Sequence, residues 1–392
     1  MFLLIKNFGI LKNINLELKK VTVITGLNDT GKSSIVKLFF SLIKADNLAE
    51  RKLEDYVKER KAKIIEQLKG LITQKDVKLV NLVDKQRNLN FLKQFFKNDK
   101  AILELLRELE LFLDKKKALN ERRNRKFYRI LTYNFGINLS PFIKKDFVME
   151  LLSNRGEKLY SVFLEKDKFQ IVDYLPTNGS RKIKPIRDVT YIETPLLMNI
   201  AEFLKEIREK SYRTETPFPF VFQDLARKIL NKDRFLTSDV YKILEEISKT
   251  INGKFLMENG LYFERNSKKI NVVGVASGIK AFGILIRLIQ TKAIQNGRDF
   301  LIIDEPEVHL HPEWQIKYVE ILIELIKVLN FNVIVSTHSP YIVQAFAKLG
   351  KDNHLENEIN FYLIDDGKSF LMNEKLNEIF RILGEPLWKV MV

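Results

Sequence analysis

Residues 26–33 read GLNDTGKS and follow the apolar-rich run VTVIT at 21–25. They match the pattern G-x-x-x-x-G-K-[ST], and the run SSIVKLFFSLI at 33–43 has the apolar spacing of a helix. Glycines let backbone N–H groups close around phosphate oxygens, and the start of a helix adds the positive end of its dipole. The segment therefore predicts a strand, a phosphate-binding loop and a helix, which together indicate an α/β fold.

The residues of this loop have distinct expected roles. We expect Lys32 to reach the outer phosphates of a nucleotide and the Ser33 hydroxyl to ligate Mg²⁺. The remaining expected phosphate contacts are Gly26, Asn28, Asp29, Thr30, Gly31 and Ser34. An ordinary glycine turn is the alternative, and the strand and helix on either side of the loop disfavour it.

A second acidic motif lies in FLIIDEPE, residues 300–307. Its four apolar residues read as a buried strand that ends at Asp304 and Glu305. We expect Asp304 to hold Mg²⁺, directly or through water, and Glu305 to polarise the attacking water. Surface carboxylates that cap a loop are the alternative, but they do not explain why a complete phosphate loop lies upstream.

Three of the four histidines lie near these motifs. NVIVSTHSP, residues 332–340, places His338 at the end of another buried strand, at the carboxyl edge where nucleotide sites of open α/β sheets gather. This position favours a polar sensor of the γ-phosphate over a structural histidine. His309 and His311 precede Pro312, and this context predicts a loop and not a metal site.

The rest of the chain divides by its periodicity. The final third alternates helix and strand, which predicts a sheet whose inner strands are buried on both faces. Residues 45–185 are instead rich in Lys, Glu and Leu and predict a mainly helical insert with a β-hairpin at 158–175. We therefore expect a head domain formed by 1–44 and 186–392, with a helical lobe at about 196–251.

Charge and composition restrict the class of partner. The 392 residues include 66 Lys and Arg against 50 Asp and Glu, a net charge of +16, which favours nucleic acid, DNA or RNA, ahead of an anionic membrane surface. Residues 114–129, DKKKALNERRNRKFYR, suit a phosphate backbone, with a solvated helix face as the alternative. The chain has no cysteine, no apolar run of the roughly 18 residues that cross a bilayer, and no signal peptide, so we expect a cytoplasmic protein without a membrane span.

Four segments in order carry a family resemblance: GLNDTGKS, ASGIK at 276–280, FLIIDEPEVHLHP at 300–312 and STHSP at 336–340. They resemble the ABC-type ATPases of the SMC, RecF and overcoming-lysogenization-defect (OLD) branch, AAA-type ATP-binding proteins of prokaryotic repair or defence systems. The resemblance covers the first 44 residues and about 250–370. It implies a P-loop NTPase fold of ABC type, with a mixed central sheet flanked by helices, and ATP and Mg²⁺ as cofactors.

The same resemblance implies an ATP-dependent homodimer or higher oligomer that holds two ATP molecules between its heads. Ser277 and Gly278 of one head would then contact the γ-phosphate bound to the other, and His338 would be the switch histidine. The family's lid glutamine has no assignable counterpart, because the candidate glutamines all lie in the insert: Gln67, Gln74, Gln86 and Gln94.

These observations predict Mg²⁺-dependent ATP hydrolysis by Glu305, His338 and Lys32, coupled to nucleic-acid repair or anti-phage defence. OLD-like nucleases carry a C-terminal TOPRIM nuclease domain, and the 54 residues after His338 are too few for one. We therefore expect a separate effector or nuclease protein. Two alternatives remain: a nucleotide-gated scaffold that sequesters a toxin-like partner, and a transport ATPase subunit, which the short ASGIK signature disfavours.

Overall fold

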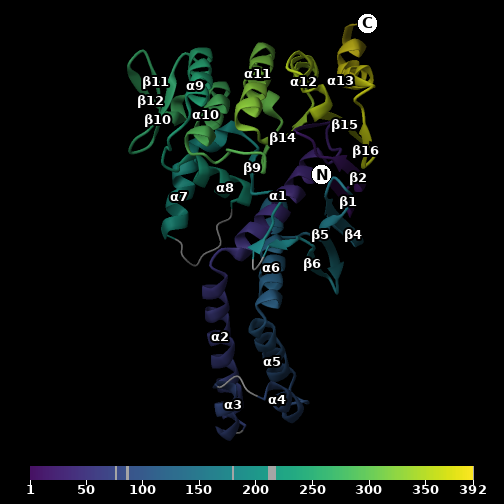
Figure 1. The fold of residues 1–392 in the computed structure, drawn as a ribbon, viewed down its shortest axis with the longest axis vertical. Helices are drawn as coiled ribbons and strands as arrows, with labels where there is room; N and C mark the ends of the chain where they lie inside the picture. The colour runs from purple at the N-terminus through teal and green to yellow at the C-terminus, as the bar shows by residue number, and fades with distance from the viewer. Residues whose placement is uncertain (76, 85–87, 179–180, 211–217, 392) are drawn as a thin grey trace. The chain divides into compact units, whose positions relative to one another are not determined.

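The computed structural model describes residues 1–75, 77–84, 88–178, 181–210 and 218–391 (Figure 1). The chain forms two compact units. The larger contains Met1–Lys44 with Arg129–Val392, and the smaller contains Ala45–Tyr128. Within the described residues, no helix has the length and apolar character that crossing a bilayer requires.

In the described part of the larger unit, eleven strands form one mixed sheet with the order β6-β5-β4-β1-β2-β16-β15-β3-β14-β13-β9. The strands are β1 Phe2–Phe8, β2 Leu11–Glu17, β3 Val21–Thr25, β4 Ile143–Leu152, β5 Lys158–Glu165, β6 Lys168–Asp173, β9 Asp188–Ile192, β13 Asp299–Asp304, β14 Asn332–Thr337, β15 Ile359–Asp365 and β16 Lys368–Leu371. Two small sheets accompany it, formed by β7 Thr177–Asn178 with β8 Arg181–Lys182, and by β10 Lys254–Met257, β11 Leu261–Arg265 and β12 Lys268–Asn271.

The five adjacent strands β15, β3, β14, β13 and β9 run parallel to one another. Every residue of β3 and β13 is buried, as expected for parallel strands covered on both faces. Because the strands run in the same direction, the residues that follow β3, β13 and β14 gather at one edge of the sheet. This arrangement confirms the predicted α/β fold and brings the three sequence motifs together.

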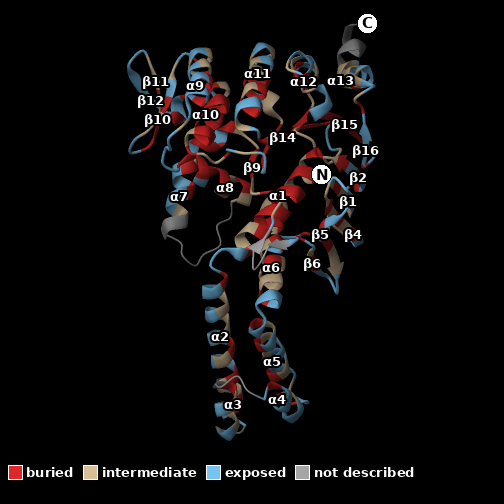
Figure 2. Ribbon diagram, in the orientation of Figure 1, coloured by how far each residue is buried: buried red, intermediate tan, exposed pale blue. Residues whose placement is uncertain are grey.

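Helices cover this parallel core on both sides. Figure 1 shows α11 and α12 on one side of β14 and β15 and α1 on the other, and Figure 2 shows buried residues concentrated in these strands and in α10. The helices are α1 Lys32–Glu50, α7 Ala201–Lys210, α8 Phe220–Ile229, α9 Ser238–Thr250, α10 Ser277–Gln290, α11 Pro312–Leu329, α12 Pro340–Asp352 and α13 Leu376–Met391. The same unit contains short 3₁₀ helices: η2 Pro195–Asn199, η3 Val272–Gly274, η4 Pro306–His309 and η5 Glu356–Glu358.

The smaller unit is helical, as the sequence predicted. It contains α2 Leu53–Thr73, η1 Val77–Leu79, α3 Val80–Asp84, α4 Leu89–Phe95, α5 Lys100–Leu113 and the first part of α6 Lys115–Phe135. Ile64, Leu68 and Ile72 of α2 are buried at a spacing of four residues, and they share a core with Leu106 and Phe112 of α5. Two amphipathic faces therefore form one core.

The insert expected at 45–185 differs from the unit observed at Ala45–Tyr128. The expected hairpin is present as β5 and β6, but it continues the main sheet through β4, which pairs antiparallel with β1. Periodicity identifies a segment as a strand but does not show which other strand it pairs with. The sequence therefore could not place residues 143–173 in the sheet.

Candidate active site

The phosphate loop joins the end of β3 at Thr25 to the start of α1 at Lys32. Gly26 and Gly31 have φ of +151° and +92°, a region that other residues rarely adopt. A Cβ at Gly26 would lie 2.5 Å from the carbonyl oxygen of Ile364, and one at Gly31 would lie 2.5 Å from Cδ2 of Leu11. Both glycines of the predicted motif are therefore required by backbone conformation and by space.

Lys32 is buried inside this loop, with 4% of its surface exposed. Its Nζ donates hydrogen bonds to the carbonyl oxygens of Leu27 at 2.7 Å and Gly26 at 3.1 Å. Burial lowers the pKa of Lys32, and the negative charges of Glu305 and Asp304 oppose that shift. The ammonium is thus held by backbone acceptors within the loop, and its contact with phosphate stays a prediction.

Asp304, the last residue of β13, is held by three hydroxyl groups. Its Oδ1 accepts from Ser33 at 3.2 Å and from Ser336, and its Oδ2 accepts from Tyr191 at 2.6 Å. The structure therefore brings together the predicted metal ligands Ser33 and Asp304. It adds Ser336 and Tyr191, which the sequence analysis missed because their roles depend on which strands are neighbours.

A magnesium ion fits this pair of residues. A hydroxyl and a carboxylate are the hard oxygen ligands that Mg²⁺ prefers, and Mg²⁺ is commonly held by one or two protein ligands together with substrate phosphates and water. Among the residues that the structure describes, no group of three or more His, Cys, Asp or Glu forms a separate metal site. Ser33 and Asp304 remain the residues that would hold the ion.

Glu305 and His338 form the next contact at this edge. Glu305 has φ of 49° and ψ of 56°, a left-handed conformation that is uncommon for a residue other than glycine. Its Oε1 lies 2.7 Å from Nε2 of His338, whose Nδ1 lies 2.9 Å from the carbonyl oxygen of Gly26. Since that carbonyl only accepts, the imidazole is the donor in the contact through Nδ1.

Glu307 is a further buried acid beside the site, and the sequence analysis assigned it no role. The backbone N–H of His338 donates to Oε1 of Glu307 at 2.6 Å. Burial raises the pKa of Glu307, and this backbone hydrogen bond opposes that shift. The repeated acid in the run DEPE was the available signal, and the structure shows that Glu307 fixes the loop that carries His338.

A cavity of about 370 Å³ opens in front of these groups. It is lined by Asn28, Asp29, Thr30, Gly31, Lys32, Ser33, Ser34, Glu305 and His338. The structure thus brings most of the predicted site residues into one space. Ser277 and Gly278 do not line it; they begin α10, where a Cβ at Gly278 would lie 3.0 Å from the carbonyl oxygen of His309.

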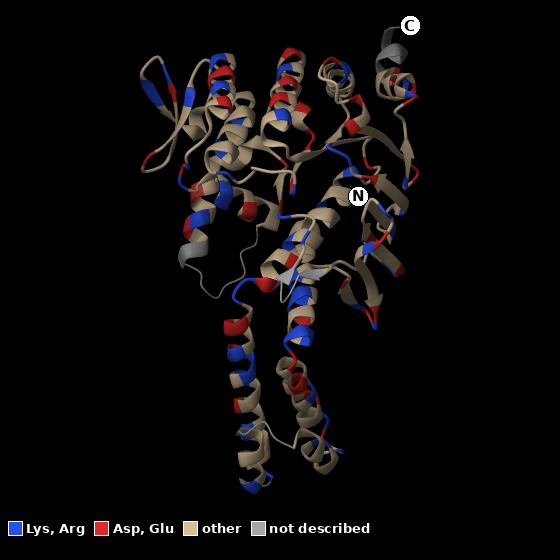
Figure 3. Ribbon diagram, viewed as in Figure 1, with Lys and Arg blue, Asp and Glu red and all other residues tan. Residues whose placement is uncertain are grey.

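Only part of the basic segment 114–129 is exposed to solvent. Arg123 is fully buried, and its Nε lies 2.8 Å from Oδ1 of Asp46, so it is not part of an exposed patch. The guanidinium of Arg122 stacks on the ring of Tyr56 at 4.5 Å. Lys115–Lys117 are exposed at the start of α6, where Figure 3 shows bands of basic residues. The amphipathic spacing places some of these cations inside the smaller unit.

Comparison with known proteins agrees with this geometry. The family described as AAA ATPase domain matches residues 1–343. Septu protein PtuA of Bacillus thuringiensis is 32% identical over 146 residues, which is 33% of this chain and 35% of that protein. The match therefore spans about a third of the length of this curated relative.

Two solved structures illustrate the structural neighbours. The SMC head domain from Thermotoga maritima has a TM-score of 0.39 and 14% identity, covering 94% of this chain and 97% of its own. The cbiO1 protein from Clostridium perfringens, part of the ABC transporter complex cbiONQ, has a TM-score of 0.36 and 12% identity, covering 99% and 96%. At these values neither structure adds to the family assignment.

Proposed function

The chain belongs to the AAA ATPase domain family and is an ATPase, and we propose that it hydrolyses ATP with Mg²⁺ in the cavity lined by the phosphate loop, Glu305 and His338. One observation carries the proposal. The residues that follow β3, β13 and β14 converge at one edge of the sheet, so that a lysine, a carboxylate and an imidazole surround a single space.

Each side chain has a task that follows from its contacts. Lys32 and the N–H groups of the loop bind the phosphates, and Ser33 and Asp304 would hold Mg²⁺, which when bound neutralises phosphate charge. Glu305 accepts a proton from the attacking water. Nε2 of His338 lies 2.7 Å from Oε1 of Glu305, so the imidazole orients the carboxylate that acts as the base.

We also propose that two heads associate on ATP, with Ser277 and Gly278 contacting the γ-phosphate bound to the partner. The N-terminus of α10 suits an anion because its backbone N–H groups and its dipole are positive there. Neither residue lines the cavity of its own head, which supports a role across an interface.

Hydrolysis is proposed to drive nucleic-acid repair or anti-phage defence through a separate effector protein. The support is the motif resemblance, the partial similarity to Septu protein PtuA and the basic charge of the smaller unit. Residues 45–128 contain 22 Lys and Arg against 14 Asp and Glu, a net charge of +8, which is half the excess of the whole chain. A polyanionic partner is the class that this charge favours.

Phosphate release tests the proposal. The purified chain should release phosphate from ATP in the presence of Mg²⁺, should lose that activity in EDTA, and should respond to added DNA or RNA. Lys242→Ala, a change at an exposed lysine of α9, should leave the rate unchanged. A wild-type chain that releases no phosphate at any protein concentration contradicts the proposal.

A further inference from the structure

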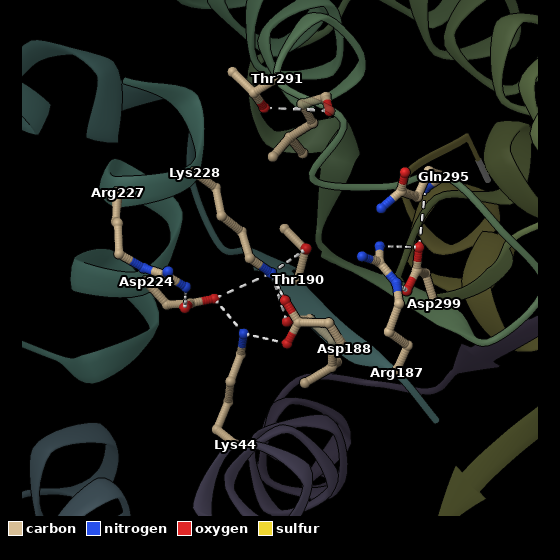
Figure 4. Close-up of polar contacts among 12 residues, drawn as sticks. Lys44, Arg187, Asp188, Thr190, Asp224, Arg227, Lys228, Thr291, Gln295 and Asp299 are labelled. Carbon is tan, nitrogen blue, oxygen red and sulfur yellow. Dashed lines mark hydrogen bonds and ion pairs between the residues drawn. The ribbon is translucent and has the colours of Figure 1, made fainter. Parts of the chain in front are cut away.

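Strand β9 ends the sheet, and its free edge has no strand partner among the described residues. Figure 4 shows that polar side chains hold it instead. Nζ of Lys44 lies 2.6 Å from Oδ1 of Asp188 and 2.7 Å from Oδ2 of Asp224. Nζ of Lys228 lies 2.9 Å from Oδ2 of Asp188 and donates a hydrogen bond to the Thr190 hydroxyl at 2.6 Å. These contacts tie β9 to α1, which begins in the phosphate loop, and to α8.

The pairing of β9 with β13 is held in the same region. Nε of Arg187, just before β9, donates to Oδ1 of Asp299 at 2.6 Å, and Asp299 is the first residue of β13. In the resulting register Tyr191 lies opposite Ile302. Because side chains alternate between the faces of a strand, Tyr191 shares a face with Ile302 and with Asp304, its diagonal neighbour.

Tyr191 is 1% exposed and packs edge-on against Phe40 of α1, with ring centroids 5.8 Å apart. Its hydroxyl donates to Oδ2 of Asp304 at 2.6 Å, while Oδ1 of the same carboxylate faces Ser33 and Ser336. Hydrogen bonds on both oxygens leave the carboxylate one orientation. In that orientation Oδ1 is the oxygen nearest the second predicted metal ligand.

We propose that Tyr191 is a positioning residue for the magnesium-binding carboxylate of Asp304, held within reach by the ion-pair cluster that anchors β9. The proposal rests on the Mg²⁺-dependent hydrolysis proposed above. Groups that hydrogen-bond a ligating carboxylate orient it, and their loss typically weakens metal binding by about 10- to 100-fold. The cluster of Lys44, Asp188, Asp224 and Lys228 then has a role at the site, because it fixes the strand that supplies the hydroxyl.

The test compares metal affinity with nucleotide affinity. Tyr191→Phe keeps the ring against Phe40 and removes only the hydroxyl. Metal binding is measured with ATP present, from the decrease of the free Mn²⁺ signal in electron paramagnetic resonance. Tyr191→Phe should bind the metal at least about tenfold more weakly than the wild type. Calorimetry of ATP binding in EDTA should give the wild-type affinity, because the phosphate loop is unchanged.

Two further variants separate positioning from stability. Tyr362→Phe removes another buried tyrosine hydroxyl, which accepts from the N–H of Glu17 at 2.8 Å, and should leave metal affinity unchanged. Phe40→Leu keeps the Tyr191 hydroxyl but loosens its ring, and should weaken metal binding less than Tyr191→Phe does. Thermal unfolding in EDTA establishes that each variant is folded.

The outcomes divide clearly. Wild-type metal affinity in Tyr191→Phe overturns the inference. The inference also fails if Tyr362→Phe or Phe40→Leu weakens metal binding as much as Tyr191→Phe does. A wild-type chain that releases no phosphate from ATP, or releases it equally well in EDTA, contradicts the proposed function instead. The two failures are therefore distinguishable.

Discussion

Nε2 of His338 lies 2.7 Å from Oε1 of Glu305, although the two residues follow different strands. The same imidazole contacts the carbonyl oxygen of Gly26 through Nδ1, and that oxygen also accepts from Lys32. A change in how Lys32 binds phosphate would thus alter the acceptor that orients His338. The contact links nucleotide binding to the group proposed to activate water.

Replacing Lys32 with Ala should weaken ATP binding by about 10- to 100-fold, because a charge-assisted hydrogen bond to phosphate is lost. Calorimetric titration with ATP measures the change, with Lys242→Ala as the control for loss of a single positive charge. Near-normal affinity in Lys32→Ala would refute the assignment of the phosphate loop.

Glu305→Gln should bind ATP and hydrolyse it at least about 100-fold more slowly, because the amide cannot accept the proton of the attacking water. Blocked turnover should accumulate an ATP-bound dimer that size-exclusion chromatography detects. A variant that stays monomeric with ATP and Mg²⁺ would exclude the two-head arrangement. A variant that keeps its biological activity without turnover would favour the nucleotide-gated scaffold.

Ser277→Arg should leave ATP binding by one head intact and stop hydrolysis, since its proposed target lies across the interface. Gly278 is a poorer position for this test, because any side chain there approaches the carbonyl oxygen of His309 in the same head. Mixing Ser277→Arg with Lys32→Ala should restore at most one working site per dimer, measured by phosphate release. Full activity in Ser277→Arg alone contradicts the arrangement.

Charge reversal at Lys115, Lys116 and Lys117 should weaken binding of DNA or RNA and flatten its dependence on salt, because fewer counterions are released. Binding isotherms over a series of salt concentrations measure the slope. Arg123 is unsuitable for this purpose, since breaking its buried pair with Asp46 costs about 3–5 kcal/mol of stability. Unchanged binding in the triple variant would support a solvated helix face.

Acid should destabilise the cluster that anchors β9. Burial raises the pKa of Asp188, but the charges of Lys44 and Lys228 outweigh it and lower the pKa from 3.8 to about 2. The folded pKa of Asp188 is the lower one, so its ionised carboxylate stabilises the fold at pH values above the unfolded pKa. This contribution is lost as the pH falls from 3.8 towards 2. The free energy of unfolding then decreases by about 2 kcal/mol.

Urea unfolding of the wild type and of Asp188→Asn at a series of pH values tests this expectation. The two curves of unfolding free energy against pH should converge between pH 5 and 2, because the variant lacks the titrating carboxylate. Parallel curves over that range would show that Asp188 does not contribute to acid sensitivity.

The local motifs were predictable because their chemistry is encoded in short segments. The turn at Gly26 and Gly31 needs glycine for conformational reasons that hold in any fold, and a buried apolar run ending at Asp304 marks the carboxyl end of a strand. The position of His338 after another such run followed from the same logic. These patterns were sufficient for the α/β fold and for most of the cavity lining.

Contacts between segments distant in the chain were not predictable from those patterns. Tyr191 reaches Asp304 only because β9 pairs with β13 in one register, and Ser336 does so only because β14 is the strand on the other side. The inclusion of 143–173 in the sheet and the burial of Arg123 have the same origin. Residue periodicity reports which face of an element is apolar, whereas the choice of neighbour depends on the packing free energy of the whole chain.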